Sequence, residues 1–255
     1  MHVKASPLLL YTEVAEDGCL GHIPALPGFS LRAANPDLLP TVLLPRIDHY
    51  AGWLLAHKLT DVSPQATEVA LARQADRLRE LQIVEAERIA GAPVWLSGSP
   101  ATLFASDRQP LSDADVQGHL RFALCAVEQM RLAVGGLAPE ARQARPAPDR
   151  RSLDETLSHV GNCIWWYCSR IDDDLPEPIE IEGEDFLDRV ARLAQDAAVY
   201  LASVPFAARG RIHVPHRFPT RDADEPWTHT KACRRQAEHL WDHLPGVRRA
   251  GGQET

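Results

Sequence analysis

Two histidines, His239 and His243, stand four residues apart in a stretch with helical spacing of apolar residues. Residues at this spacing lie one turn apart on one face of an α-helix, where both imidazoles can bind the same metal ion. A third, His159, lies in the first half of another expected helix whose apolar stripe includes Val160 and Ile164. If the two helices are neighbours, three imidazoles converge and leave positions open for water or substrate, as in a catalytic metal site.

Further side chains on the first of these helices could take part in such chemistry. Cys163 follows His159 by four residues and shares its face, so it is either a fourth ligand or a small buried apolar residue. Tyr167 could donate a proton, and Arg170 could hold an anionic group of a substrate. Aromatic core filling and a cation at the helix end are equally good explanations of this pair.

The second helix carries charged residues beside its histidines. Arg235 precedes His239 by four residues and could pair with an anionic ligand, or form a structural salt bridge. Glu238 and Asp242 each precede a histidine by one residue, so we expect them to point away from the metal, toward supporting or solvent-facing positions. We expect four other histidines to lie at the surface, namely His119, His213, His216 and His229.

Long amphipathic helices must position these residues. Ser112 is an expected helix cap, and Ser152 with Glu155 forms a capping-box pattern at the start of a helix that runs to about residue 171. Further helices are expected over 184–203 and from 228 to a stop at Pro245-Gly246. Four such helices predict a bundle.

The first part of the chain has a different pattern. Strands are expected over 8–14, 19–23 and 29–33, with a hairpin at Glu16-Asp17-Gly18. A helix is expected from about 37 to 59, another from Ser63-Pro64, and further short strands over 83–89, 94–96 and 102–104. The predicted class is α+β, with a small α+β domain at residues 1–110 followed by an all-α four-helix bundle at residues 111–250.

Three stretches in the second half resemble the DinB-like metalloprotein superfamily. They are Leu157-Ser158-His159 continuing through Trp165-Trp166-Tyr167-Cys168-Ser169-Arg170, then Glu225-Pro226-Trp227-Thr228, then Arg234-Arg235-Gln236-Ala237-Glu238-His239 ending at His243. The resemblance covers about residues 111–246 and implies a four-helix bundle in which His159, His239 and His243 bind a divalent metal, zinc or nickel. It also implies activation of a low-molecular-weight thiol for transfer or isomerisation, with a small molecule as substrate.

The stretch from Glu16-Asp17-Gly18-Cys19 to Leu26-Pro27-Gly28, followed by a helix, resembles a HicB-type antitoxin domain. This resemblance implies a partial RNase-H-like fold. The chain departs from the HicB pattern where an aliphatic stretch with Pro40 and Pro45 replaces the usual polar start of the helix. The alternative to a metal-dependent transferase, isomerase or hydrolase is therefore a non-enzymatic regulatory protein, whose front module binds a partner and whose bundle is stabilised by metal.

Composition excludes several other classes of protein. The 255 residues are 45% hydrophobic and 24% charged, which is typical of a globular protein. The net charge of −8 disfavours nucleic-acid binding, and the apolar runs are too short for a membrane span. Five cysteines without a C-x-x-C pair favour the reducing cytoplasm over a disulfide framework. A homodimer is compatible with the pattern, because bundles with an apolar outer face often dimerise.

Overall fold

The computed structural model describes residues 7–91, 99–217 and 225–253, and it has an α+β fold, as expected. The sheet in these ranges has four strands in the order β3-β2-β1-β4. The strands are β1 (Leu8–Ala15), β2 (Gly18–His22), β3 (Ser30–Ala33) and β4 (Ile83–Ala90). The first three form an antiparallel meander, and β4 lies parallel to β1. The predicted hairpin and the strand expected over 83–89 are therefore confirmed.

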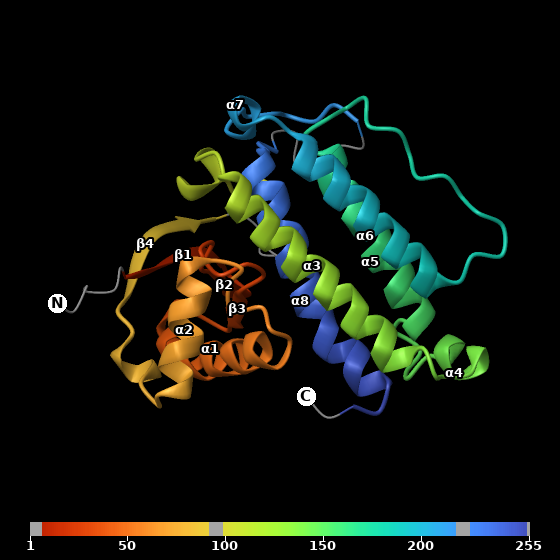
Figure 1. The fold of residues 1–255 in the computed structure, drawn as a ribbon, viewed down its shortest axis with the longest axis horizontal. Coiled ribbons are helices and arrows are strands. Elements are labelled where there is room, and N and C mark those ends of the chain that lie inside the picture. Colours follow the sequence, from red (N-terminus) through yellow and green to blue (C-terminus); the bar gives the residue numbers. More distant parts are fainter. Residues whose placement is uncertain (1–6, 92–98, 218–224, 254–255) are drawn as a thin grey trace.

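Two helices accompany the sheet, α1 (Leu39–Ala56) and α2 (Pro64–Gln74) (Figure 1). The Ser63 side chain caps α2 by accepting a hydrogen bond from the amide of Ala66 at 2.9 Å. Pro45 lies inside α1, where a proline removes one backbone hydrogen bond. The helix continues through it because Ile47 and Tyr50 on its buried face are fully enclosed in the core.

Four long helices make up the second part, and each packs against two of the others. They are α3 (Asp113–Val134), α5 (Leu153–Ser169), α6 (Phe186–Ser203) and α8 (His229–Ala250). Helix α3 contacts α6 and α8, while α5 contacts the same two helices. Short helices α4 (Pro139–Gln143) and α7 (Phe206–Arg209) lie in the connections, and 3-10 turns cover Pro36–Leu38, Leu78–Glu80 and Ser106–Arg108.

The structure corrects some expected boundaries. Helix α8 does not stop at Pro245-Gly246 but continues to Ala250. Its apolar contacts outweigh the effect of the proline, because Leu244 and Val247 on either side are each 1% exposed. Residues 102–104 form no strand, and the strand expected over 94–96 lies outside the described residues.

The two parts share one hydrophobic core. Trp241 of α8 is fully buried, and its ring packs against Tyr50 and Trp53 of α1 and against Phe122 of α3, with centroids 5.2–5.8 Å apart. Helix α3 also approaches the front part closely at Gly118, where a Cβ would lie 1.9 Å from the carbonyl oxygen of Val62. The core cluster contains residues of both parts, so the described residues of the front part and of the bundle share one core.

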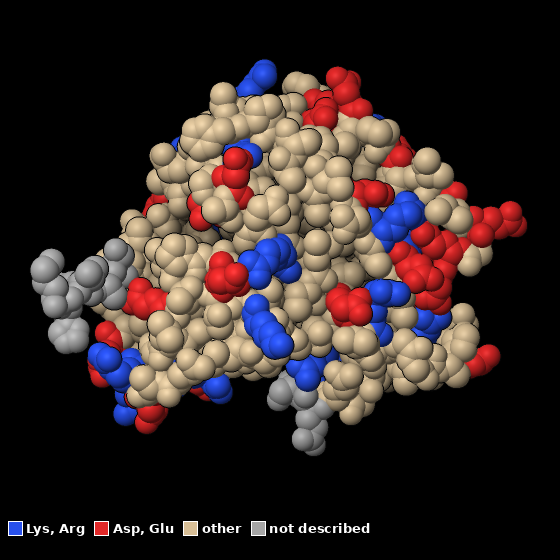
Figure 2. All heavy atoms as spheres, in the orientation of Figure 1, with Lys and Arg blue, Asp and Glu red and all other residues tan. Residues whose placement is uncertain are grey.

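The charged side chains on the face seen in Figure 2 are mixed, with one acidic concentration. Acidic side chains gather at the right-hand end, where Figure 1 places the loop between α5 and α6. This loop includes Glu177, Glu180, Glu182 and Glu184. No helix in the described ranges is long and apolar enough to cross a membrane.

Candidate metal centre

The two helices that carry the histidines each begin at a side-chain cap. The Ser152 hydroxyl accepts from the amide of Glu155 at 3.1 Å, and the Glu155 carboxylate accepts from the amide of Ser152 at 2.7 Å. Thr228 caps α8 by accepting from the amide of Lys231 at 3.1 Å. The caps set the start of each helix, and with it the turn on which each histidine stands. The capping box expected at residue 152 is confirmed.

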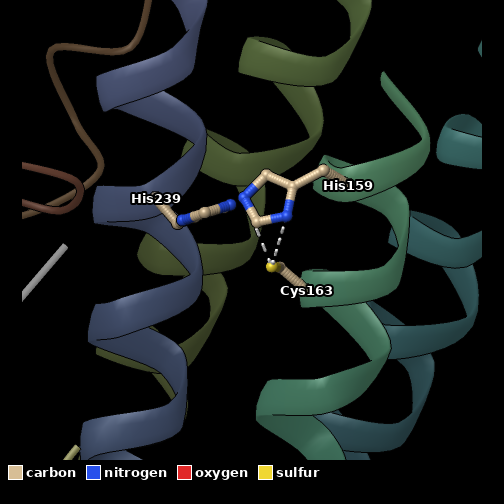
Figure 3. Close-up of side chains that lie close together, drawn as sticks. All are labelled: His159, Cys163 and His239. Carbon is tan, nitrogen blue, oxygen red and sulfur yellow. Dashed lines mark hydrogen bonds between the residues drawn. The ribbon is translucent and has the colours of Figure 1, made fainter. Parts of the chain in front are cut away.

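The imidazoles of His159, His239 and His243 lie together between α5 and α8. The ring centroid of His159 is 5.1 Å from that of His239 and 5.3 Å from that of His243, and the two rings of α8 are 4.5 Å apart. Figure 3 shows His159 directed from α5 toward α8, and His239 directed from α8 toward α5. The three rings that the sequence selected therefore lie side by side, whereas the ligand atoms within 4.8 Å of one another belong to His159, His239 and Cys163.

Cys163 adds a sulfur to this cluster. Its Sγ lies 3.6 Å from Nδ1 of His159, and the side chain is half-buried (Figure 3). One potential ligand atom from each of His159, Cys163 and His239 lies within 4.8 Å of the others. Zinc bonds of about 2.0–2.3 Å place tetrahedral ligand atoms roughly 3.3–3.8 Å apart, so small side-chain rotations would bring these atoms onto one ion. The alternative that Cys163 is only a buried apolar residue fits this position less well.

The electrostatic surroundings favour neutral imidazoles. Burial lowers the pKa of His243 to about 4, helped by the nearby His159 and Arg151. The pKa of His239 lies well below its usual value because of burial and the two neighbouring histidines, and burial also lowers the pKa of His159. Neutral imidazole is the form that binds a metal. Burial raises the pKa of the Cys163 thiol to about 11, so a bound metal would have to displace its proton.

Of the residues predicted to act in catalysis, Tyr167 lies beside the cluster. Its ring is 5.8 Å from that of His239 and 5.9 Å from that of Trp227. Arg170 is fully buried at the end of α5, where its guanidinium stacks over Trp166 and donates to the backbone carbonyl of Arg217 at 2.7 Å. These contacts agree with the alternative in which Arg170 is a structural cation at the helix end. Of the two residues, Tyr167 is the one with a ring beside the imidazoles.

Arg235 is 3% exposed, and its Nη1 lies 4.0 Å from a carboxylate oxygen of Glu13 on β1. This ion pair corresponds to the salt-bridge alternative. Arg235 and Arg151 both favour ionisation of the Cys163 thiol electrostatically. Arg151 is not among the site residues that the sequence predicts. Its position directly before the Ser152 cap could have indicated that it lies near the start of the helix that carries His159. The cluster is therefore surrounded by positive charge.

A second group of buried charges lies beside the centre, and sequence reasoning missed it. Arg234 donates to both carboxylate oxygens of Asp107 at 2.8 Å and to Glu238 at 3.0 Å. Glu238 also lies 3.0 Å from Nδ1 of His22, whose Nε2 is 3.3 Å from Glu13. Glu238 thus points away from the metal centre, as expected, but toward β2 rather than solvent.

Two histidines assigned to the surface are instead in the interior. His119 is 4% exposed and His229 is 2% exposed, and a ring nitrogen of His229 lies 2.8 Å from the carbonyl oxygen of Leu201. His216 is exposed, as predicted, and His213 is half-buried beside Asp173. The prediction for His119 and His229 was wrong because it relied on the polarity of histidine, whereas α3 and α8 are enclosed on several sides.

Comparison with known proteins gave no relative of this chain. No family model, no curated protein and no solved structure matches it.

Proposed function

We propose that this chain is a DinB-like protein that binds one divalent metal ion, zinc or nickel, through His159, His239 and His243, with Cys163 as a further ligand. The observation that supports this proposal is the meeting of three imidazoles and a thiol from two separate helices. Nitrogen and sulfur donors are those preferred by zinc and related metals. The low pKa values of the imidazoles agree with this assignment, because a ligand must be deprotonated.

We further propose that the protein is an enzyme that activates a low-molecular-weight thiol or water for transfer to a small electrophile. A bound divalent metal would lower the pKa of the thiol or water and produce a nucleophile near neutral pH. His159 and Cys163 are half-buried, so a small molecule can reach this side of the cluster. The proximity of the Tyr167 ring to His239 supports a role for Tyr167 in orienting or protonating the reactant, and the positive charges of Arg151 and Arg235 favour an anionic one.

The alternative of a non-enzymatic regulatory protein receives less support. A HicB-like front module that acts as a separate binding unit would need a surface of its own. Its Trp53 and Tyr50 instead pack on Trp241 of α8, and its His22 is buried against Glu238. We infer that the front module shapes the site rather than serving a second partner. The reducing cytoplasm, where five free cysteines would persist, is the proposed location.

Metal analysis of the purified protein after loading with zinc or nickel tests the site. We expect about one equivalent of metal in the unaltered chain, and loss of most of it in His159→Ala, His239→Ala and His243→Ala. The control is His216→Ala, which removes an exposed histidine outside the cluster and should retain the metal. A partial loss in Cys163→Ala would identify the sulfur as a ligand. Failure of the unaltered chain to bind either ion at micromolar concentration would overturn the proposal.

Turnover tests the enzymatic part separately. A small thiol and a chromogenic aryl halide, or a chromogenic ester with water, are supplied to the metal-loaded and the metal-free protein. We expect a rate above background with metal that falls at least tenfold in His239→Ala. Equal rates in the loaded and metal-free protein would contradict the proposed role of the metal.

A further inference from the structure

A groove between α8 and the front module has His243 of the proposed metal centre among its lining residues. Its volume is about 650 Å³, within the range of small-molecule sites. One wall is the outer side of α8, with His243 of the proposed metal site, and the other is built from β3 and the exposed side of α1. The ionisable residues on its walls are Arg32, Arg46, His49, Asp242, His243 and Arg249.

The charge of this groove is opposite to that of the whole chain. Three arginines and one aspartate line it, whereas the chain carries 35 acidic and 27 basic residues. A local surplus of guanidinium groups inside a concave surface attracts and orients anions. Because the chain is otherwise acidic, this surplus distinguishes the groove from the general surface.

Two charged side chains of the groove are held in place by the protein. Arg46 donates from Nε to the carbonyl of Ser30 at 3.0 Å, and its guanidinium lies 5.0 Å over the Trp241 ring. Asp242 accepts from the Ser30 hydroxyl through Oδ1 at 2.9 Å and lies 3.7 Å from Arg46. Its Oδ2 is buried as well, out of reach of a molecule that lies in the groove.

We infer that this groove binds the carboxylate of an acidic substrate and directs the rest of the molecule toward His243. This inference rests on the proposed function and names its substrate class. The carboxylate interacts with the arginines of the groove. The front module thereby contributes to substrate recognition, since β3 and α1 supply Arg32 and Arg46.

The probe for this site is N-acetylglycine, which carries a carboxylate next to an N–H. Binding is measured by NMR titration of the metal-free protein, so that it does not depend on the metal. We expect saturable millimolar binding that shifts the His243 ring signals. The neutral N-acetylglycinamide should bind at least tenfold more weakly, because it lacks the charge.

Charge variants assign the binding to the groove. The double variant Arg32→Gln/Arg249→Gln should weaken N-acetylglycine binding at least tenfold, and Arg249→Lys should retain most of it. Arg79→Gln removes an exposed arginine that does not line the groove and is the matched control. A urea denaturation curve for each variant shows that it is folded.

The outcomes separate this inference from the proposed function. Loss of binding in the double variant with unchanged metal content supports the groove. Equal binding of the acid and the amide, or unchanged binding in the double variant, overturns it even if the metal site is real. Conversely, a chain that binds N-acetylglycine through these arginines but takes up no metal supports the groove and refutes the metal centre.

Discussion

Two histidines lie on different sides of helix α8, His243 toward α5 and His22 toward the sheet. Their surroundings keep the first neutral and make the second a cation. On the side of α5, burial lowers the pKa of His243 to about 4, and the adjacent groups His159 and Arg151 lower it as well. On the side of the sheet, burial opposes protonation of His22, but the charge of Glu238 and hydrogen bonds to Glu13 and Glu238 raise its pKa to about 9. Both rings are largely removed from water, so the carboxylates make the difference.

The difference separates two uses of a buried histidine. Without a carboxylate beside it, an imidazole stays neutral and keeps a nitrogen available for a metal. Between two carboxylates it becomes a cation and joins an ion-pair network, here one that connects β1 and β2 to α8. The two kinds of environment are only one residue apart on the helix, since Glu238 precedes His239.

The largest loss of stability is expected from removing Arg234 from the buried network of Arg234, Asp107, Glu238 and His22. Arg234→Met leaves Asp107 and Glu238 buried without their guanidinium partner, and all three residues are at most 2% exposed. Removing one partner of a buried ion pair typically destabilises a protein by about 3–5 kcal/mol. The free energy of unfolding, measured by urea denaturation at pH 7, should fall by this amount.

The matched control for this change is Arg131→Met. Arg131 also bridges two carboxylates, those of Glu128 and Asp188, but its side chain is 41% exposed. Exposed pairs contribute less than about 1 kcal/mol, so this variant should be nearly as stable as the unaltered protein. Equal losses in the two variants would mean that the buried network has no special role.

A smaller effect is expected from pH through His22. Its pKa is about 9 in the folded protein, above the ordinary histidine value of 6.5 that applies to the unfolded chain, so the folded state holds the proton more tightly. The stabilisation is fully present below pH 6.5 and is lost as the pH rises from 6.5 through 9. The contribution of His22 to the free energy of unfolding should therefore decline over this window, by on the order of 2 kcal/mol.

His22→Gln isolates this contribution. The variant cannot gain the proton, so it should be less stable than the unaltered chain at pH 6.5, and the difference in free energy of unfolding should shrink between about pH 6.5 and 8.5. His216→Gln, which changes an exposed histidine, should keep the original slope. Parallel curves for His22→Gln and the unaltered chain would show that His22 is not charged in the folded state.

The cluster of three histidines could be predicted from the sequence because its spacing is local. His239 and His243 share a helical face by their separation alone, and the Ser152 cap with its apolar stripe predicts the helix that carries His159. The meeting of α5 and α8 needed only the expectation that four amphipathic helices form a bundle. The same reasoning predicted the β-meander, whose hairpin signal lies at residues 16–18.

The buried ion-pair network around Arg234 and His22 could not be predicted in this way, because its pairs join segments that are distant in the sequence. His22 and Glu238 are 216 positions apart, and nothing local to either residue indicates the other. The predicted end of α8 was wrong for a related reason. A proline has a local cost that the sequence makes visible, whereas the burial of Leu244 and Val247 against the core depends on residues elsewhere in the chain.

The smallest expected effect comes from introducing a carboxylate, like those beside His22, next to the histidine cluster. Cys163→Asp places a carboxylate next to His159, where Sγ now lies 3.6 Å from Nδ1. The pKa of His159, at present lowered by burial, should rise by about one unit, as expected for a half-exposed charge pair. NMR titration of the His159 ring protons with a chelator present measures the shift. Cys163→Asn has the same shape without the charge and should leave the pKa low, so an equal rise in both variants would show that polarity or packing, rather than a neighbouring carboxylate, sets the charge of these imidazoles.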